Sequence, residues 1–200
     1  MTSIVLAGGR ARRLGRDKLS EMVGGQTLLQ RVIEHLGLLS EEILIVIAQH
    51  RPCPALTASP VEVVTDLYPG GGALGGIYTG LVRARSLHSL VVAGDMPFLN
   101  PFLLRYLIQL SPEFDVVVPR VEGRLEPLHA VYSKNCLIPI QRRIELGELK
   151  ILGFLEQVRV RYVEEAEIDK LDPKRLSFFN INTLADLRRA RAMLKELKTQ

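Results

Sequence analysis

Hydrophobic residues along the chain form short continuous runs that alternate with segments of helical spacing. The runs are rich in Val, Ile and Leu and end in polar residues, Gly or Pro; they are Ile4–Ala7, Ile43–Ala48, Val61–Val64, Leu90–Ala93 and Val116–Val118. Such runs are typical of strands buried on both faces of a parallel sheet. Between them we predict helices at Leu28–Leu39, Gly76–Arg85 and Pro101–Leu110, the last with Asn100 as its N-cap. This alternation predicts an α/β fold with right-handed crossovers.

After residue 119 the alternation is less regular, but the same kinds of element follow. We expect strands at Leu128–Tyr132 and Val158–Val163 and helices at Asn135–Leu146 and Ile151–Gln157. Thr183 is expected to cap a last helix that ends near Lys198 and faces inward with Leu184, Leu187, Ala190, Met193, Leu194 and Leu197. No repeat or linker interrupts the 200 residues. Residues 1–200 are therefore predicted to form one domain, a three-layer α/β/α sandwich around a mostly parallel, Rossmann-like sheet.

Composition narrows the kinds of ligand. The net charge of +4 is modest, aromatic residues make up 6% of the chain and tryptophan is absent, so a small anionic ligand is favoured over nucleic acid. No apolar run approaches the roughly 20 residues of a membrane span, and an apolar strand begins too early for a signal peptide. The spacing of Cys53 and Cys136 fits neither a metal site nor a disulfide framework. We therefore expect a cytoplasmic protein without membrane contact.

The loop after the first strand carries the clearest chemical signal. Gly8 and Gly9 let the backbone approach a ligand closely, and five cations follow within nine residues: Arg10, Arg12, Arg13, Arg16 and Lys18. The spacing matches neither a P-loop nor a dinucleotide fingerprint, because the next glycine is Gly15 and Arg16 and Asp17 follow it. The loop predicts a nucleotide phosphate site, the alternative being an ordinary solvated turn; which arginines contact phosphate stays open.

Two aspartates follow predicted strands that end at the same edge of the sheet, where ligands bind in such folds. Asp95 follows Leu90–Ala93 and is our candidate ligand for Mg²⁺, which takes one or two protein carboxylates and completes its shell with phosphate and water oxygens. The alternative is an Asx turn before Pro97. Asp66 is either a solvated turn residue or a nucleoside contact. Arg13 and Lys18 are expected to stabilise the charge that develops during nucleotidyl transfer.

Two further features near these aspartates have both structural and functional interpretations. The glycine run Gly70–Gly76 is either a surface loop or a backbone platform for the nucleoside, with Gly75 and Gly76 opening the following helix. His129 lies in a strand that approaches the same cleft, but a lone strand histidine is more often structural than catalytic. His35, His50 and His88 lack paired carboxylates and are weaker candidates.

These motifs together resemble the molybdenum cofactor guanylyltransferases, the MobA-like branch of the nucleotidyltransferases with a glycosyltransferase-A-like (nucleotide-diphospho-sugar transferase-like) fold. The matching blocks occur in the family's order over nearly the whole chain: Leu6–Gly9 with Arg12–Gly15 and Asp17–Lys18, Asp66 with Gly72–Ile77, Gly94–Leu99, Glu126–Tyr132 and Phe178–Thr183. The chain departs from the family pattern at Ala73, where proline is frequent, and at Val46–Gln49, where some members carry an asparagine that contacts the nucleoside.

The resemblance implies transfer of GMP from GTP to the phosphate of molybdopterin, with Mg²⁺ as cofactor and pyrophosphate as the second product. It implies that the N-terminal part of the chain binds nucleotide and the C-terminal part binds the acceptor. By matched positions, the nucleotide contacts are Leu6, Ala7, Gly8, Gly9, Lys18, Asp66, Gly75 and Asp95, and the acceptor contacts are Asn180 and Asn182. Transient contact with other molybdenum cofactor biosynthesis proteins or recipient molybdoenzymes is also implied.

Three alternatives stay open at this point. A sister enzyme that uses CTP on the same pterin fits the same motifs, as does another sugar- or alcohol-phosphate nucleotidyltransferase. A nucleotide sensor or cofactor chaperone would need the binding loop but not a metal carboxylate such as Asp95.

Overall fold

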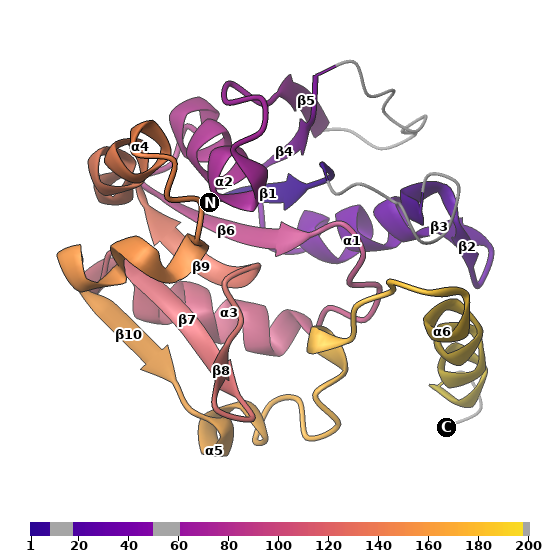
Figure 1. The fold of residues 1–200 in the computed structure, drawn as a ribbon. Coiled ribbons are helices and arrows are strands. Elements are labelled where there is room, and N and C mark those ends of the chain that lie inside the picture. The colour runs from indigo at the N-terminus through magenta and orange to yellow at the C-terminus, as the bar shows by residue number, and fades with distance from the viewer. Residues whose placement is uncertain (9–17, 50–60, 198–200) are drawn as a thin grey trace.

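A mixed β-sheet forms the centre of the computed structural model, which describes residues 1–8, 18–49 and 61–197 (Figure 1). Seven of its strands lie in the order β10-β7-β9-β6-β1-β4-β5, and the eighth, β8 (Arg124–Leu125), pairs only with β7. The seven strands are β1 (Thr2–Leu6), β4 (Glu42–Ile47), β5 (Val61–Thr65), β6 (His88–Ala93), β7 (Val116–Val121), β9 (His129–Ser133) and β10 (Val160–Val163).

Strand directions confirm the mostly parallel sheet: β9 is the one reversed strand among the seven, and the short β8 also runs antiparallel to β7. β1 pairs in parallel with both β4 and β6, β4 with β5, and β7 with β10. β9 runs antiparallel to its neighbours β6 and β7. As a result, the carboxyl ends of β1, β4, β5 and β6 meet the start of β9 at one edge of the sheet.

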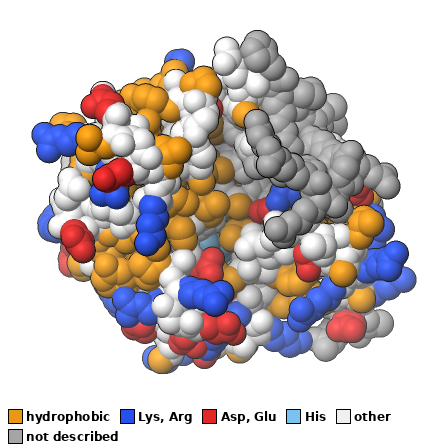
Figure 2. All heavy atoms as spheres, in the orientation of Figure 1, with side chains coloured by type: hydrophobic (Ala, Val, Ile, Leu, Met, Phe, Trp, Pro, Cys, Tyr) orange, Lys and Arg blue, Asp and Glu red, His pale blue; other side chains and the backbone are white. Residues whose placement is uncertain are grey.

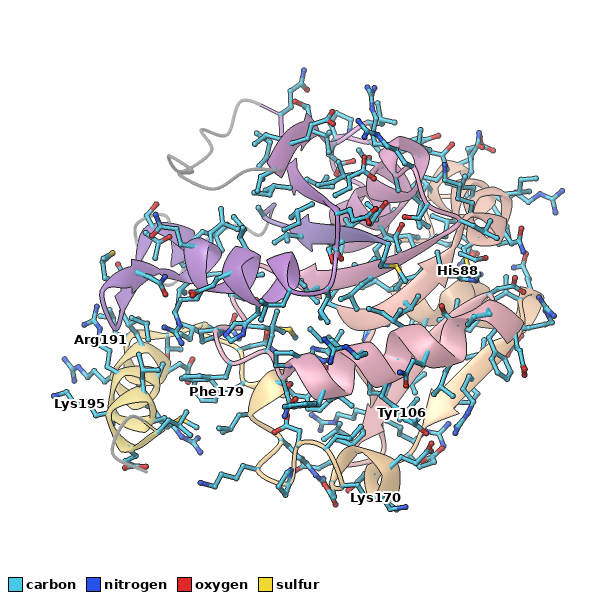
Figure 3. All side chains as sticks on the ribbon, turned by 180° about the vertical axis from the view of Figure 1, so that it is seen from behind. His88, Tyr106, Lys170, Phe179, Arg191 and Lys195 are labelled. Carbon is cyan, nitrogen blue, oxygen red and sulfur yellow. The ribbon has the colours of Figure 1, made fainter. Side chains whose placement is uncertain are left out.

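Helices cover both faces of this sheet, as predicted for three layers. α1 (Leu28–Gly37) and α3 (Pro101–Leu110) pack on one face, which is turned toward the viewer in Figure 3. α2 (Gly72–Arg83), α4 (Leu137–Glu145) and the 3-10 segment η4 (Ile151–Gln157) pack on the other. Alternate residues of each strand enter the two cores: Val5 faces α1 and α3, and Ile4 faces α2.

A third, smaller apolar cluster joins the last helix to the N-terminal part of the chain. It contains Ile181, Leu187, Ala190 and Leu194 from the region of α6 (Leu184–Leu197) and Val23, Leu28 and Phe98 from elsewhere. Val23 lies in a hairpin of two short strands, β2 (Met22–Val23) and β3 (Gln26–Thr27). Arg191 of α6 donates to the Met22 carbonyl oxygen at 2.9 Å, and Figure 3 shows it beside this hairpin.

Several predicted boundaries were wrong. α2 begins at Gly72 rather than at Gly76, because Gly70 and Gly72 adopt positive φ angles of 88° and 61° and turn the chain into the helix four residues earlier. α4 begins only at Leu137, since residues 134–136 form a 3-10 turn. Residues 151–157 are likewise 3-10 rather than α-helical.

Other departures concern short elements and the surface of α6. The hairpin of β2 and β3, β8, and the one-turn helix α5 (Glu165–Ile168) were not predicted. Thr183 does cap α6, in reciprocal hydrogen bonds with Asp186. Leu184 and Leu197 are 52% and 41% exposed, so they do not share the inward face of Leu187 and Leu194. None of the helices in the described residues is both long and apolar enough to cross a membrane.

Candidate active site

A cavity of about 1030 Å³ lies at the edge where the strand ends meet (Figure 2). Around the middle of this face hydrophobic side chains gather, with charged side chains among them. The described residues that line the cavity are Leu6, Ala7, Gly8, Lys18, Leu19, Val46, Ile47, Ala48, Gln49, Asp66, Pro69, Gly70, Gly72, Ala73, Gly76, Ala93, Asp95, Met96, Glu126, Pro127, Leu128, Ile151, Asn180 and Asn182.

Backbone hydrogen bonds carry the sheet pattern past the strand ends and fix the cavity floor. The Ala7 amide donates to Val46 at 2.9 Å, and the Gly94 amide donates to Leu6 at 3.1 Å. On the far side, the Ala93 amide donates to Leu128 at 3.1 Å. The residues that follow β1 and β6 are therefore held next to one another and next to the segment that enters β9.

Lys18 and Asp95, which both line the cavity, form an ion pair. The Lys18 ammonium donates to an Asp95 carboxylate oxygen, and the two side chains are only 16% and 13% exposed. Lys18 also donates to the Asn182 side-chain oxygen at 3.4 Å, and the Ile181 amide donates to the Asp95 carbonyl at 3.1 Å. The structure thus brings together three predicted site residues from the start, middle and end of the chain.

Asp66 lines the cavity and also organises the turn before α2. One of its carboxylate oxygens accepts from the Thr79 hydroxyl at 2.8 Å and from the Tyr68 amide at 3.1 Å. Gly75 packs beneath this turn: a Cβ there would lie 3.3 Å from the other Asp66 oxygen. The cavity wall is formed instead by Gly72, Ala73 and Gly76, so the structure places Gly75 behind the wall.

Part of the predicted phosphate loop lies outside the described residues. This applies to Gly9, Arg10, Arg12, Arg13 and Arg16, and likewise to His50 and Cys53. Leu6, Ala7 and Gly8, which precede that segment, do line the cavity, and so do Asn180 and Asn182.

His129 does not line the cavity. Its ring is fully buried 4.7 Å from the ring of Phe178, and burial lowers its pKa to about 3. Neither ring nitrogen has a hydrogen-bond partner among the described residues. Cys136 is also buried, and its thiol donates to the Asp115 carbonyl at 3.4 Å, in keeping with a structural role.

Glu126 is a cavity residue that we did not predict as part of the site. It lines the wall beside Pro127 and Leu128, and burial raises the pKa of its carboxyl group. The sequence does contain a signal, because Glu126 opens the Glu126–Tyr132 block, but it precedes a strand instead of following one.

A mostly parallel sheet with a cavity at its carboxyl edge, a glycine-lined wall and a lysine–carboxylate pair defines a nucleotide-binding α/β protein. Residues 3–160 match the family model described as the MobA-like NTP transferase domain. The chain belongs to this family.

The chain resembles relatives of this family over nearly its full length. A protein named probable molybdenum cofactor guanylyltransferase from Pelotomaculum thermopropionicum is 40% identical over 198 residues, which cover 99% of this chain and 95% of that protein. The molybdenum cofactor guanylyltransferase of Desulfosudis oleivorans is 36% identical, with coverage of 98% and 96%. The crystal structure of molybdopterin-guanine dinucleotide biosynthesis protein A from Archaeoglobus fulgidus superimposes with a TM-score of 0.82 at 31% identity, covering 98% of this chain and all of that one.

Proposed function

We propose that this chain is a molybdenum cofactor guanylyltransferase, which transfers GMP from GTP to the phosphate of molybdopterin and releases pyrophosphate. The names of its near-full-length relatives support this activity. The observation that carries the proposal is the meeting of Lys18, Asp95 and Asn182 on one cavity floor, because a transferase must hold donor and acceptor on either side of one reacting centre.

The two substrates occupy opposite sides of Asp95 in this proposal. The nucleotide lies on the side of Ala7, Gly8 and the first turn of α2, where backbone amides and the positive end of a 12-residue helix favour phosphate. The acceptor lies on the side of Asn180 and Asn182. The N-terminal part of a single domain then binds nucleotide, and its C-terminal part binds the acceptor.

The cavity suits a magnesium ion that arrives with the triphosphate. Among the described residues there is no group of three or more His, Cys, Asp or Glu side chains that would hold a metal alone. Asp95 supplies one carboxylate in the cavity, which fits Mg²⁺ because the ion takes its other ligands from phosphate and water oxygens. Bound there, the ion would offset negative charge on the triphosphate.

The chain's own residues act on charge and position. An oxygen of the molybdopterin phosphate attacks the α-phosphorus of GTP, a new P–O bond forms, and the bond to the β-phosphate oxygen breaks as pyrophosphate leaves. Lys18 stabilises the negative charge on the transferring and leaving groups, with Arg13 proposed for the same task. Asp95 holds Lys18 in place before the ligand binds, through their ion pair.

Activity with four nucleotides tests this proposal. The protein is incubated with molybdopterin, Mg²⁺ and GTP, CTP, UTP or ATP, and the dinucleotide product and pyrophosphate are measured. We expect product with GTP. Product with CTP alone would instead assign the sister cytidylyl activity, and saturable GTP binding without product would assign a sensor or carrier.

A variant of Asp95 separates catalysis from folding in the same assay. Asp95→Asn should lower turnover roughly 100-fold or more, since it removes the charge at the reacting centre, while the far-ultraviolet circular dichroism spectrum is unchanged. Glu113→Gln, an exposed carboxylate away from the cavity, is the matched control and should keep parental turnover. Unchanged turnover in Asp95→Asn would contradict the mechanism.

A further inference from the structure

Hydrogen bonds hold the backbone around Glu126, a residue of the cavity wall, in place. The Glu126 amide donates to the Pro119 carbonyl at 2.9 Å, and its own carbonyl accepts from the His129 amide at 3.0 Å. The Tyr132 hydroxyl donates to the Pro127 carbonyl at 2.7 Å. These bonds close a tight turn between β8 and β9, in which Glu126 lines the cavity.

The Glu126 carboxylate has no side-chain partner among the described residues. No ion pair or hydrogen bond joins it to a neighbouring side chain, although Arg124 is close enough to offset part of the pKa increase that burial causes. Partial burial of an unpaired carboxylate costs free energy. This cost is recovered when a ligand donates hydrogen bonds to both oxygens, because bonds to ionised acceptors are stronger than neutral ones.

The wall next to Glu126 is apolar and lies on the acceptor side. Pro127, Leu128 and Ile151 line it together. In the sheet, β6 with Asp95 at its end separates β9 from β1, β4 and β5, whose ends form the nucleotide side. This wall suits a ligand group that has apolar faces and hydrogen-bond donors on one edge, on the side of the cavity where the proposed acceptor binds.

We propose that Glu126 determines specificity for the acceptor, by accepting hydrogen bonds from the adjacent N–H groups of a 2-amino-4-oxopyrimidine ring such as that of a pterin. The 2-amino group and the neighbouring ring N–H are two donors side by side, and they match the two oxygens of one carboxylate. Apolar side chains of Pro127, Leu128 and Ile151 would contact the ring faces. This inference rests on the proposed function, and it names the residue that would recognise the pterin ring of the acceptor.

The test compares Glu126→Gln with Glu122→Gln. The control is an exposed glutamate on the same hairpin that does not line the cavity. For Glu126→Gln we expect the KM for molybdopterin to rise roughly ten-fold to a hundred-fold, because a charge-assisted bidentate contact is lost. The KM for GTP and the rise in unfolding temperature caused by GTP and Mg²⁺ should match those of the parent and of the control.

A binding comparison tests Glu126 apart from turnover. Pterin and lumazine, which carries oxygen in place of the 2-amino group, are titrated against the parent and Glu126→Gln. The parent should prefer pterin, and the variant should lose most of that preference because its amide donates to the lumazine oxygen.

The possible negative results distinguish failure of the Glu126 assignment from failure of the proposed function. Equal molybdopterin KM values in parent and Glu126→Gln, or equal pterin preference, would overturn the assignment of Glu126. A selective rise in the KM for GTP would also overturn it, by placing guanine at this wall. Failure of the parent to make a dinucleotide from GTP would contradict the proposed function instead, and the pterin–lumazine titration would still decide whether Glu126 reads the 2-amino group.

Discussion

Glu126 and His129 are three residues apart; Glu126 is partly buried and His129 is fully buried, and the fold uses them differently. Glu126 keeps one face to the cavity, whereas His129 is fully enclosed against Phe178. Burial disfavours the charged form of each, so it raises the pKa of the carboxyl group and lowers that of the imidazole. Glu126 is therefore available to a ligand, while His129 acts only on stability.

The His129 pKa predicts acid-sensitive folding. Its folded-state pKa of about 3 lies below the ordinary 6.5, so the unfolded chain binds more protons between these values. Stability is then fully present above about pH 6.5 and is lost as the pH falls toward 3, by about 2 kcal/mol at pH 5. His35, whose pKa burial also lowers, acts in the same direction.

Urea unfolding at pH 7 and pH 5 checks this prediction. His129→Leu should be at least as stable as the parent at pH 7, because it removes two buried ring nitrogens that have no hydrogen-bond partner in the part of the chain that the structure describes. Its loss of stability between pH 7 and pH 5 should be smaller than the parent's by about 2 kcal/mol. An identical loss in both proteins would show that His129 does not carry the effect.

At the scale of elements, the glycines of α2 allow it to lie close to β1. A Cβ on Gly80 would lie 2.5 Å from the nearest Ile4 methyl carbon, and one on Gly76 would lie 3.1 Å from the Leu6 side chain. At Gly37, the last residue of α1, no atom of a packing neighbour among the described residues lies within 4 Å of such a position. Gly80 of α2 and Gly37 of α1 therefore give a matched pair of one crowded and one open position.

Alanine at these two positions should have opposite effects. Gly80→Ala should destabilise the protein by roughly 1–3 kcal/mol, because an added methyl in a packed core forces Ile4 to move. Gly37→Ala should be neutral or stabilising by up to about 1 kcal/mol, since alanine favours the helix. The unfolding temperatures of both variants test this prediction. Equal changes in unfolding temperature would mean that α2 does not need glycine at position 80 to lie close to β1.

The hydrophobic pattern located the long elements because each buries a run of Val, Ile or Leu. It could not give the direction of β9, since a strand buried on both faces looks the same in either orientation. It also missed β2, β3 and β8, which have only two residues each and so show no period. The pattern also missed the early start of α2. Gly70 and Gly72 are typical of loops, but here their positive φ angles turn the chain into the first turn of the helix.

The convergence of Lys18 and Asp95 could be predicted from their places after β1 and β6, because parallel strands end at one edge. The approach of Asn182 came only from the family resemblance, since no local pattern indicates that a segment after residue 175 returns to that edge. Glu126 was missed as a site residue because the same rule considers only residues that come after the end of a strand, and β9 enters the sheet in reverse.

At the scale of the whole molecule, α6 packs against the rest of the protein through a separate apolar cluster and not through the two main cores. Leu187, Ala190 and Leu194 pack with Val23, Leu28 and Ile181, and Ile181 lies in the sequence between Asn180 and Asn182, the proposed acceptor contacts. The packing of α6 therefore holds the segment that carries Asn180 and Asn182 against the cavity.

Weakening this cluster should affect the acceptor more than the nucleotide. Leu187→Ala removes a buried side chain, a change that costs about 2–5 kcal/mol in a packed core, and should increase amide hydrogen exchange at residues 180–194. The KM for molybdopterin should rise while the stabilisation by GTP and Mg²⁺ is retained. Leu184→Ala, at an exposed position of the same helix, should resemble the parent; equal loss of GTP and acceptor binding in Leu187→Ala would contradict this division.

The reversal of β9 has a consequence for how the cavity can be altered. One side of the cavity is formed by residues at the carboxyl ends of β1, β4, β5 and β6. The other side is formed by the turn that leads into β9. That turn and the β7–β8 hairpin before it, residues 119–128, are closed by the hydrogen bond from the Glu126 amide to the Pro119 carbonyl. We therefore expect that another segment of the same length, grafted at residues 119–128, would change which acceptor is used and would leave the proposed nucleotide side of the cavity intact.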